Sequence, residues 1–169
     1  MNPGWLLLVA AVGMLAGLAL ARPAARLWLA ATLISSAATL GATIVILARG
    51  SVWDWQTAFP IGGEPVHLRL DGLSAFFLTL LAGLNAAAAI YSREYWSDQA
   101  HPRSAPSGRA WWSGFVGSMG LVLLSANGLH FLIGWEIYTV CAYFLITRER
   151  QLPKVRAAGC EGRYVIVGK

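Results

Sequence analysis

The chain consists of long apolar runs separated by short polar segments. A helix needs about 20 predominantly apolar residues to cross the hydrocarbon core of a bilayer. None of the runs alternates apolar and polar residues, as a strand of a membrane barrel would. Since backbone groups within lipid must hydrogen-bond internally, each run is predicted to be helical. Five runs approach the required length: 3–21, 27–48, 70–91, 111–126 and 128–147.

The segments between the runs differ in character. Ser125-Ala126-Asn127-Gly128 favours a tight turn, so one very long apolar stretch divides into two antiparallel helices. Residues 50–69 are polar, and the alternation over Val66–Leu70 is compatible with a short exposed β-hairpin. Residues 92–110 contain two prolines and a glycine, and they are interpreted as a flexible connector.

These features predict an all-α, polytopic membrane helix bundle with about five transmembrane helices. Two N-terminal helices fall in residues 1–49, an external loop in 50–69, a three-helix region in 70–147 and a basic cytoplasmic tail in 148–169. A signal peptide is an alternative for the first run, because Ala19-Leu20-Ala21 is similar to a cleavage site. The start of the chain lacks the positive charge of a signal peptide, so a retained span is preferred.

Composition excludes most soluble enzymes. The chain has 169 residues, of which 57% are hydrophobic and 12% charged, whereas soluble domains carry about 25% charged residues. The two cysteines, Cys141 and Cys160, make neither a disulfide framework nor a metal site. Since the sequence also lacks a phosphate-binding loop and a nucleophile triad, no catalytic residue, metal ligand or cofactor is expected.

The basic residues predict an orientation. Lysines and arginines gather on the cytoplasmic side of membrane proteins. With five spans, eleven of the thirteen share one side, and Arg49 and Arg69 lie on the other. We therefore expect an external N-terminus, a cytoplasmic C-terminus and a multi-pass location in the inner (plasma) membrane. The basic residues are expected to meet anionic lipid rather than nucleic acid.

Glu136 is the candidate site residue, because it is the only charged residue well inside any run. A charge at the bilayer centre costs about 2.5–3.5 kcal/mol on insertion scales, and such residues by default mark ion or proton paths. Thr139 and Tyr143 follow at i+3 and i+7, on the same helical face, where their hydroxyls could support the carboxylate. The structural alternative is a glutamate that is protonated or hydrogen-bonded between helices.

Two further residues are candidates near the outer surface. Asp71 begins the third run, three residues before Ser74, and is expected to cap that helix. The alternative for Asp71 is a role in proton access from outside. His130 lies one turn into the fifth run, where it is either an ordinary interfacial histidine or a proton relay.

Three motifs carry a resemblance to a known family. Arg69–Ser74 resembles the start of a helix in the N-terminal region of antiporter-like membrane subunits, and Tyr91–Tyr95 resembles the segment that closes it. Gly134-Trp135-Glu136, followed by Tyr143–Ile146, resembles their glutamate-bearing helix. The family contains proton-pumping subunits of respiratory complex I (the L type), membrane subunits of hydrogenase-4 and formate hydrogenlyase (the B type), and Mrp-type antiporter subunits (the A type).

The resemblance implies a mechanism and partners. It implies a non-catalytic membrane subunit of a redox-driven proton pump, either a complex I-like NADH:quinone oxidoreductase or a hydrogenase-4-like complex. In the family the glutamate pairs with a lysine on a later helix. The other membrane subunits would be partners and would connect the chain to a redox arm. An Mrp-type cation/proton antiporter subunit is one alternative, and a non-functional fragment or small structural membrane protein is another.

The chain departs from the family after Arg156. Family members continue there with further helices, whereas residues 157–169 hold only a short apolar stretch, Tyr164–Val167. The only lysines are Lys154 and Lys169, neither of which lies in a run. These departures predict a truncated, frameshifted or fragmentary member in which Glu136 lacks its partner lysine.

Overall fold

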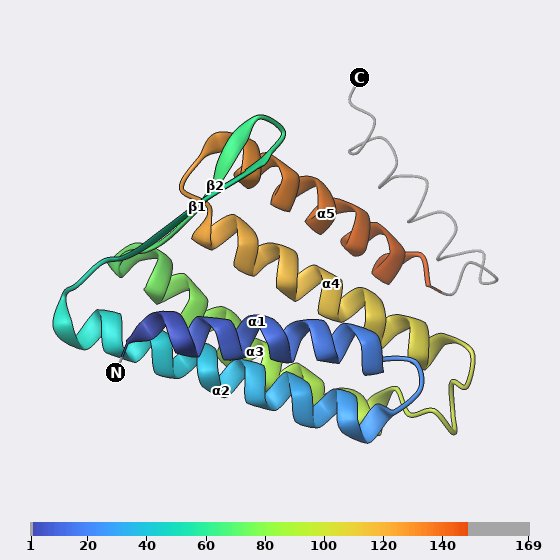
Figure 1. Cartoon of the computed structure of the whole chain (residues 1–169). Coiled ribbons are helices and arrows are strands. Elements are labelled where there is room, and N and C mark those ends of the chain that lie inside the picture. Colours follow the sequence, from blue (N-terminus) through green and yellow to red (C-terminus); the bar gives the residue numbers. More distant parts are fainter. Residues whose placement is uncertain (1, 149–169) are drawn as a thin grey trace.

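A computed structural model describes residues 2–148 and shows five helices lying side by side, with one β-hairpin (Figure 1). The predicted all-α bundle of five helices is therefore confirmed, with the hairpin as its one β element within residues 2–148. Expectations for residues 149–169, including the basic tail and the truncation, lie outside the described residues. The elements are α1 (Pro3–Leu20), α2 (Ala25–Arg49), β1 (Trp53–Ile61), β2 (Glu64–Leu70), α3 (Gly72–Tyr95), α4 (Ser104–Leu124) and α5 (Gly128–Ile146).

Four of the described helices are long and apolar enough to cross a membrane, namely α1, α2, α3 and α5. The predicted fourth span lies in α4, which is not among these four. Serines, glycines, tryptophans and Arg109 reduce the mean hydropathy of α4. α4 nevertheless contacts α1, α3 and α5 along the bundle. Its crossing of the membrane stays a prediction.

Small and polar side chains join the helices on the inside of the bundle. The Ser35 hydroxyl donates to the Ala10 carbonyl of α1 (2.7 Å), and Trp28 Nε1 donates to Ser113 Oγ of α4 (2.9 Å). Asn85 Nδ2 donates to Ser36 Oγ (3.0 Å), while Asn85 Oδ1 accepts from Trp112 Nε1 (2.9 Å). In lipid, association of helices depends on close packing and such hydrogen bonds, since burial of apolar surface between helices gains little.

Glycines set the contact between α4 and α5. A Cβ placed on Gly134 of α5 would lie 3.0 Å from Val122 Cγ2 and 3.2 Å from the Val122 nitrogen. A Cβ on Gly114 of α4 would lie 2.9 Å from Cys141 Sγ. His130, Gly134 and Cys141 are the buried residues of α5. They form a single stripe along the helix, and this stripe fixes how α5 is rotated against α4.

The β-hairpin is longer than the Val66–Leu70 alternation suggests. β1 and β2 pair antiparallel from Trp53↔Leu70 to Ile61↔Glu64. Gly62 and Gly63 form its two-residue turn with φ of 66° and 89°, the left-handed region that glycine adopts without a Cβ penalty. Leu70, which is fully buried, anchors the base of the hairpin in a core with Ile46 and Leu78.

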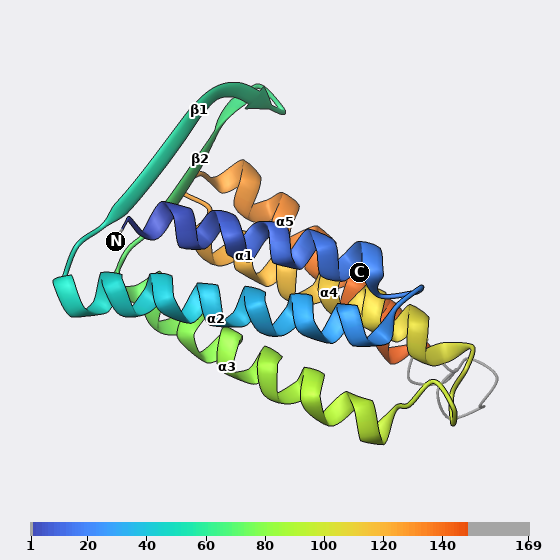
Figure 2. The same cartoon turned by 60° about the horizontal axis from the view of Figure 1, so that its bottom comes forward.

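The hairpin crosses one end of the bundle and holds the turn between α4 and α5 (Figures 1 and 2). The Ala126 nitrogen donates to the His67 carbonyl (3.0 Å), and Asn127 Nδ2 donates to the Pro65 carbonyl (3.2 Å). Asn127 also caps α5, since its side-chain oxygen accepts from the His130 nitrogen (2.8 Å). The Ser125–Gly128 turn is thus confirmed, with the hairpin as an unforeseen support.

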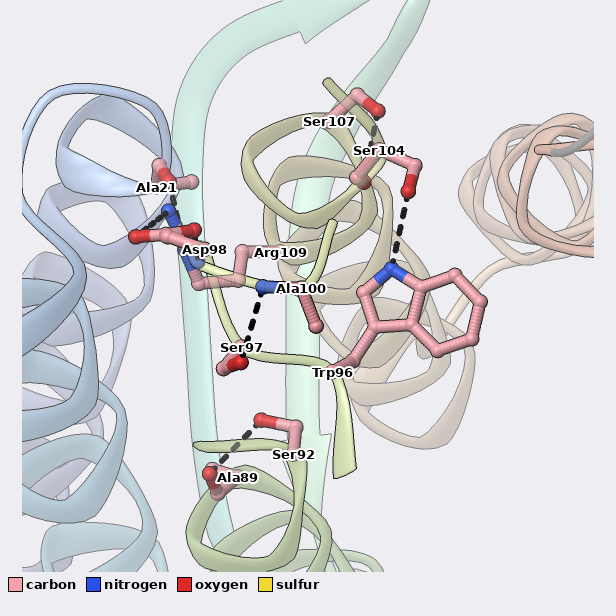
Figure 3. Close-up of polar contacts among 10 residues, drawn as sticks. All are labelled: Ala21, Ala89, Ser92, Trp96, Ser97, Asp98, Ala100, Ser104, Ser107 and Arg109. Carbon is pink, nitrogen blue, oxygen red and sulfur yellow. Dashed lines mark hydrogen bonds and ion pairs between the residues drawn. The ribbon is translucent and has the colours of Figure 1, made fainter. Parts of the chain in front are cut away.

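The prediction of a flexible connector over residues 92–110 is wrong at both ends. α3 continues to Tyr95, and α4 begins at Ser104, so only residues 96–103 connect them. Pro106 lies in the first turn of α4, where a missing N–H costs nothing. Side chains tie the connector to the bundle: Arg109 forms an ion pair with Asp98 (2.6 Å) and donates through Nε to the Ala21 carbonyl (2.8 Å), as Figure 3 shows.

The contact at Gly134 yields a stability prediction. Gly134→Leu forces a side chain into the Val122 backbone, and overpacking of this kind costs about 1–3 kcal/mol. We expect that loss in the free energy of unfolding, measured by circular dichroism during titration of mixed micelles with dodecyl sulfate. Gly83→Leu is the matched control, because Gly83 faces open space on α3. Equal effects of the two substitutions would contradict the close α4–α5 contact.

Candidate functional site

Glu136 lies on the outward face of α5. It is the ninth of the 19 residues of this helix and is exposed. Two residues of helix turn the chain by about 200°, so the carboxylate points away from the side on which Gly134 touches α4. Leu132 (57% exposed), Trp135 (50%) and Val140 (44%) surround it on the same face. Glu136 is therefore a single carboxylate on an apolar surface that no described helix covers.

The structure does not join the hydroxyls of the predicted stripe to this carboxylate. Thr139 Oγ1 donates instead to the Trp135 carbonyl (2.9 Å), and Thr147 Oγ1 donates to the Tyr143 carbonyl (2.8 Å). Tyr143 is half-buried. Within residues 2–148, the Glu136 carboxylate makes neither a hydrogen bond nor an ion pair. Support from Thr139 and Tyr143 stays a prediction.

Asp71 caps α3. Its carboxylate accepts a hydrogen bond from the Ser74 nitrogen (2.9 Å), and its backbone is extended, as expected of an N-cap. The bond from the Ser74 backbone lowers the pKa of Asp71, against a smaller opposing effect of burial; the Ser74 side chain, Arg69 and the Leu73 backbone contribute further lowering. The cap directly precedes the first residue of the span, so Asp71 lies at the hairpin end of the third helix. That this end faces the outside stays a prediction.

His130 is buried inside the bundle. Its side chain belongs to the buried stripe of α5, and the residue is 4% exposed. Both ring nitrogens lack a hydrogen-bond partner among the described residues. A buried imidazole without partners carries a desolvation cost, but it lies six residues from Glu136 on a different face of the helix. The structure therefore does not bring His130 and Glu136 together.

Sequence reasoning missed the buried amide of Asn85. Asn85 is 2% exposed in the middle of α3 and bridges α2 and α4. The sequence did carry a signal, namely a single asparagine inside the apolar run of α3. An amide at such a position needs hydrogen-bond partners from neighbouring helices. Within residues 2–148, no three His, Cys, Asp or Glu side chains gather as a group that could hold a metal ion.

The two ends of the bundle differ in charge. Four segments meet at the end of the bundle away from the hairpin: the start of α2, the end of α3, the start of α4 and the residue that follows α5 (Figures 1 and 2). The hairpin end holds Arg49 and Arg69. The far end carries six of the described arginines: Arg22, Arg26, Arg93, Arg103, Arg109 and Arg148. The charge asymmetry used to predict the orientation is thus a property of the folded bundle.

Known proteins match about half of the chain. One relative is NADH-quinone oxidoreductase subunit L of Buchnera aphidicola subsp. Schizaphis graminum (strain Sg), 36% identical over 80 residues, which are 47% of this chain and 12% of the relative. Another is the A/B subunit of a probable K(+)/H(+) antiporter from Rhizobium meliloti (strain 1021), 30% identical over 93 residues, 55% of this chain and 9% of the relative. No family profile matches the chain.

Over about half of its length the chain is similar to antiporter-like membrane subunits. The resemblance seen in the three motifs is therefore confirmed at the level of the family. The chain matches only about a tenth of the length of each of these relatives. Together with the four apolar helices, the matches support a membrane location for this chain.

The cap at Asp71 leads to a second prediction. Asp71→Ala should lower the free energy of unfolding at pH 7 by about 1 kcal/mol, since the α3 cap is lost. Asp71→Ser should retain most of the stability, because serine also caps. The fold lowers the pKa of Asp71 from its usual value of 3.8. The ionised carboxylate therefore stabilises the folded chain above pH 3.8, and this stabilisation is lost as the pH falls through the lowered pKa.

The gap in stability between the parent and Asp71→Ala should therefore narrow below pH 4 or so. Unfolding titrations in mixed micelles between pH 3 and pH 7 measure it. A gap that widens on acidification would show that the carboxylate is not acting as the cap.

Proposed function

We propose that this chain forms the N-terminal part of a proton-translocating, antiporter-like subunit in a complex I-like NADH:quinone oxidoreductase or a hydrogenase-4-like complex. Glu136 is the proton-carrying carboxylate. The chain lies in the inner (plasma) membrane with its N-terminus outside. Neighbouring membrane subunits connect it to a redox arm that carries out the electron transfer.

The placement of Glu136 carries this proposal. Glu136 lies halfway along a helix that is apolar enough to span the membrane, and its own bundle leaves it uncovered. Exposure of an ionised carboxylate to acyl chains is costly, so a spanning helix with this residue needs a polar group or water opposite it. A further helix or subunit that presents a cation to this face would meet the requirement and would regulate uptake and release of the proton.

The other candidate residues take supporting roles. Thr139 and Tyr143 lie one and two turns along from Glu136, and their hydroxyl oxygens can accept hydrogen bonds from water near the carboxylate. Asp71 fixes the outer end of α3 through its cap. His130 is proposed to exchange protons with the outside near the hairpin, because a buried imidazole with two unpartnered nitrogens can both accept and release a proton.

A cation/proton antiporter subunit is the second candidate. The Rhizobium meliloti relative, which belongs to a probable K(+)/H(+) antiporter, favours it. The same carboxylate serves both functions, since either one requires an intramembrane acid that binds and releases a proton. They differ in the driving force, which is electron transfer in the first case and a cation gradient in the second.

Vesicle measurements test the proposal. Inverted membrane vesicles are prepared from cells that hold this chain in place of every other copy of the subunit, and they are loaded with a pH-sensitive dye. Addition of NADH should acidify the lumen, and Glu136→Gln should slow this acidification about tenfold or more, because the proton acceptor is removed. Glu136→Asp should retain part of the rate. Acidification or alkalinisation driven by added K⁺ or Na⁺ without NADH would favour the antiporter.

Glu94→Gln is the matched control. Glu94 is an exposed acid in the last turn of α3, outside the proposed path, and its neutralisation should leave proton movement unchanged. If vesicles with Glu136→Gln acidify as fast as the parent under every driving force, Glu136 does not carry the proton.

A further inference from the structure

A second feature of the bundle is a cavity of about 680 Å³ at the end away from the hairpin. It lies among the start of α2, the end of α3, the 96–103 connector, the start of α4 and Arg148 after α5. Figure 3 shows part of its wall, where Trp96 Nε1 donates to Ser104 Oγ (3.2 Å) and Arg109 meets Asp98. Glu136, in the middle of α5, does not line this cavity.

Positive charge exceeds negative charge in the wall of the cavity. Four arginines line it, against the two acids Glu94 and Asp98. Asp98 is paired with Arg109, and the guanidinium of Arg148 lies 4.2 Å from the ring centre of Trp96. Arg26 and Arg93 form no ion pair within residues 2–148. The cavity thus presents two unpaired guanidinium groups, which are suited to bidentate contact with phosphate oxygens.

Aromatic residues gather in the wall of the cavity. Tyr91 (62% exposed) and Tyr95 (64%) line it and stack on each other with ring centres 5.3 Å apart. Trp96 and Trp112 lie in the same wall. Amphipathic aromatic rings collect where the hydrocarbon meets the headgroups. We therefore expect the unpaired arginines to lie at the depth of lipid phosphates.

We propose that this cavity binds the phosphate headgroup of an anionic phospholipid, with Arg26 and Arg93 as its ligands. Basic pockets between spans on the cytoplasmic side bind anionic headgroups in this way. The lipid would hold α2 and α3 together at an end where the hairpin gives no support. This inference does not depend on proton transfer by Glu136; it requires only that the bundle lies in a membrane.

Lipid titration of the purified chain in a neutral detergent tests the site. Native mass spectrometry counts bound molecules of phosphatidylglycerol, which is anionic, and of phosphatidylcholine, which is zwitterionic. We expect tighter binding of phosphatidylglycerol. Arg26→Gln and Arg93→Gln should each weaken it about fivefold, the equivalent of about 1 kcal/mol per surface charge, without changing binding of phosphatidylcholine.

Arg22→Gln is the matched control, because Arg22 is exposed at the same end of the bundle but does not line the cavity. It should change the affinity less than twofold. Arg26→Lys and Arg93→Lys keep the positive charge. If they bind phosphatidylglycerol better than the glutamine variants do, the loss of binding in the glutamine variants follows from the missing charge and not from misfolding. Three results would each overturn the proposal. The parent could bind both lipids with equal affinity, Arg22→Gln could weaken binding as much as Arg26→Gln does, or millimolar inorganic phosphate could displace the lipid.

Discussion

The close approach of α5 to α4 determines where the only carboxylate in the middle of a described span points. Gly134 and Gly114 let the two backbones come together, and His130, Gly134 and Cys141 form the face of α5 that this contact buries. Because a helix turns by about 100° per residue, Glu136 must then face outward. A residue larger than glycine at position 134 would change the rotation or the separation of α5, and the direction of the carboxylate would change with it.

The remainder of the bundle keeps this arrangement rigid without a large apolar core. Asn85, Ser36 and Trp112 join α2, α3 and α4 through hydrogen bonds inside the bundle, and Trp28 joins α2 to α4. The β-hairpin fixes the turn from which α5 starts, at one end. At the other end the Asp98–Arg109 ion pair fixes the connector before α4. α5 is thus held along α4 and at its start, while its outer face stays available to a partner.

Much of this could be predicted from the sequence, and the remainder depends on tertiary contacts. The five helices follow from the length of the apolar runs, and the Asp71 cap follows from the spacing to Ser74. The position of Glu136 within its helix was predictable, but its direction was not, because that depends on which face of α5 packs on α4. The hydroxyl of Thr139 turned to its own backbone, a local bond that competes with any longer contact.

One error comes from a residue type that was interpreted without its neighbours. The segment 92–110 has loop-forming residues, but Pro106 falls in a first helical turn, where proline is tolerated. The burial of His130 was likewise not predictable from its spacing, because it depends on which face of α5 packs on α4. The family resemblance was sounder, because it depended on three motifs in order, and the matches to known proteins support it.

The most direct test of the central claim is a spin-label scan of α5. Single cysteines at 131–133 and 135–140, in a chain with Cys141 and Cys160 replaced by serine, carry a nitroxide in reconstituted bilayers; Gly134 is kept, because a label there would disturb the α4–α5 contact. The collision rate with oxygen, which dissolves in the hydrocarbon, reports which positions face outward. An outward-facing Glu136 predicts a helical period with high rates at 132, 136 and 140 and low rates at 133 and 138. A minimum at 136 would contradict it, because Glu136 would then lie inside the bundle.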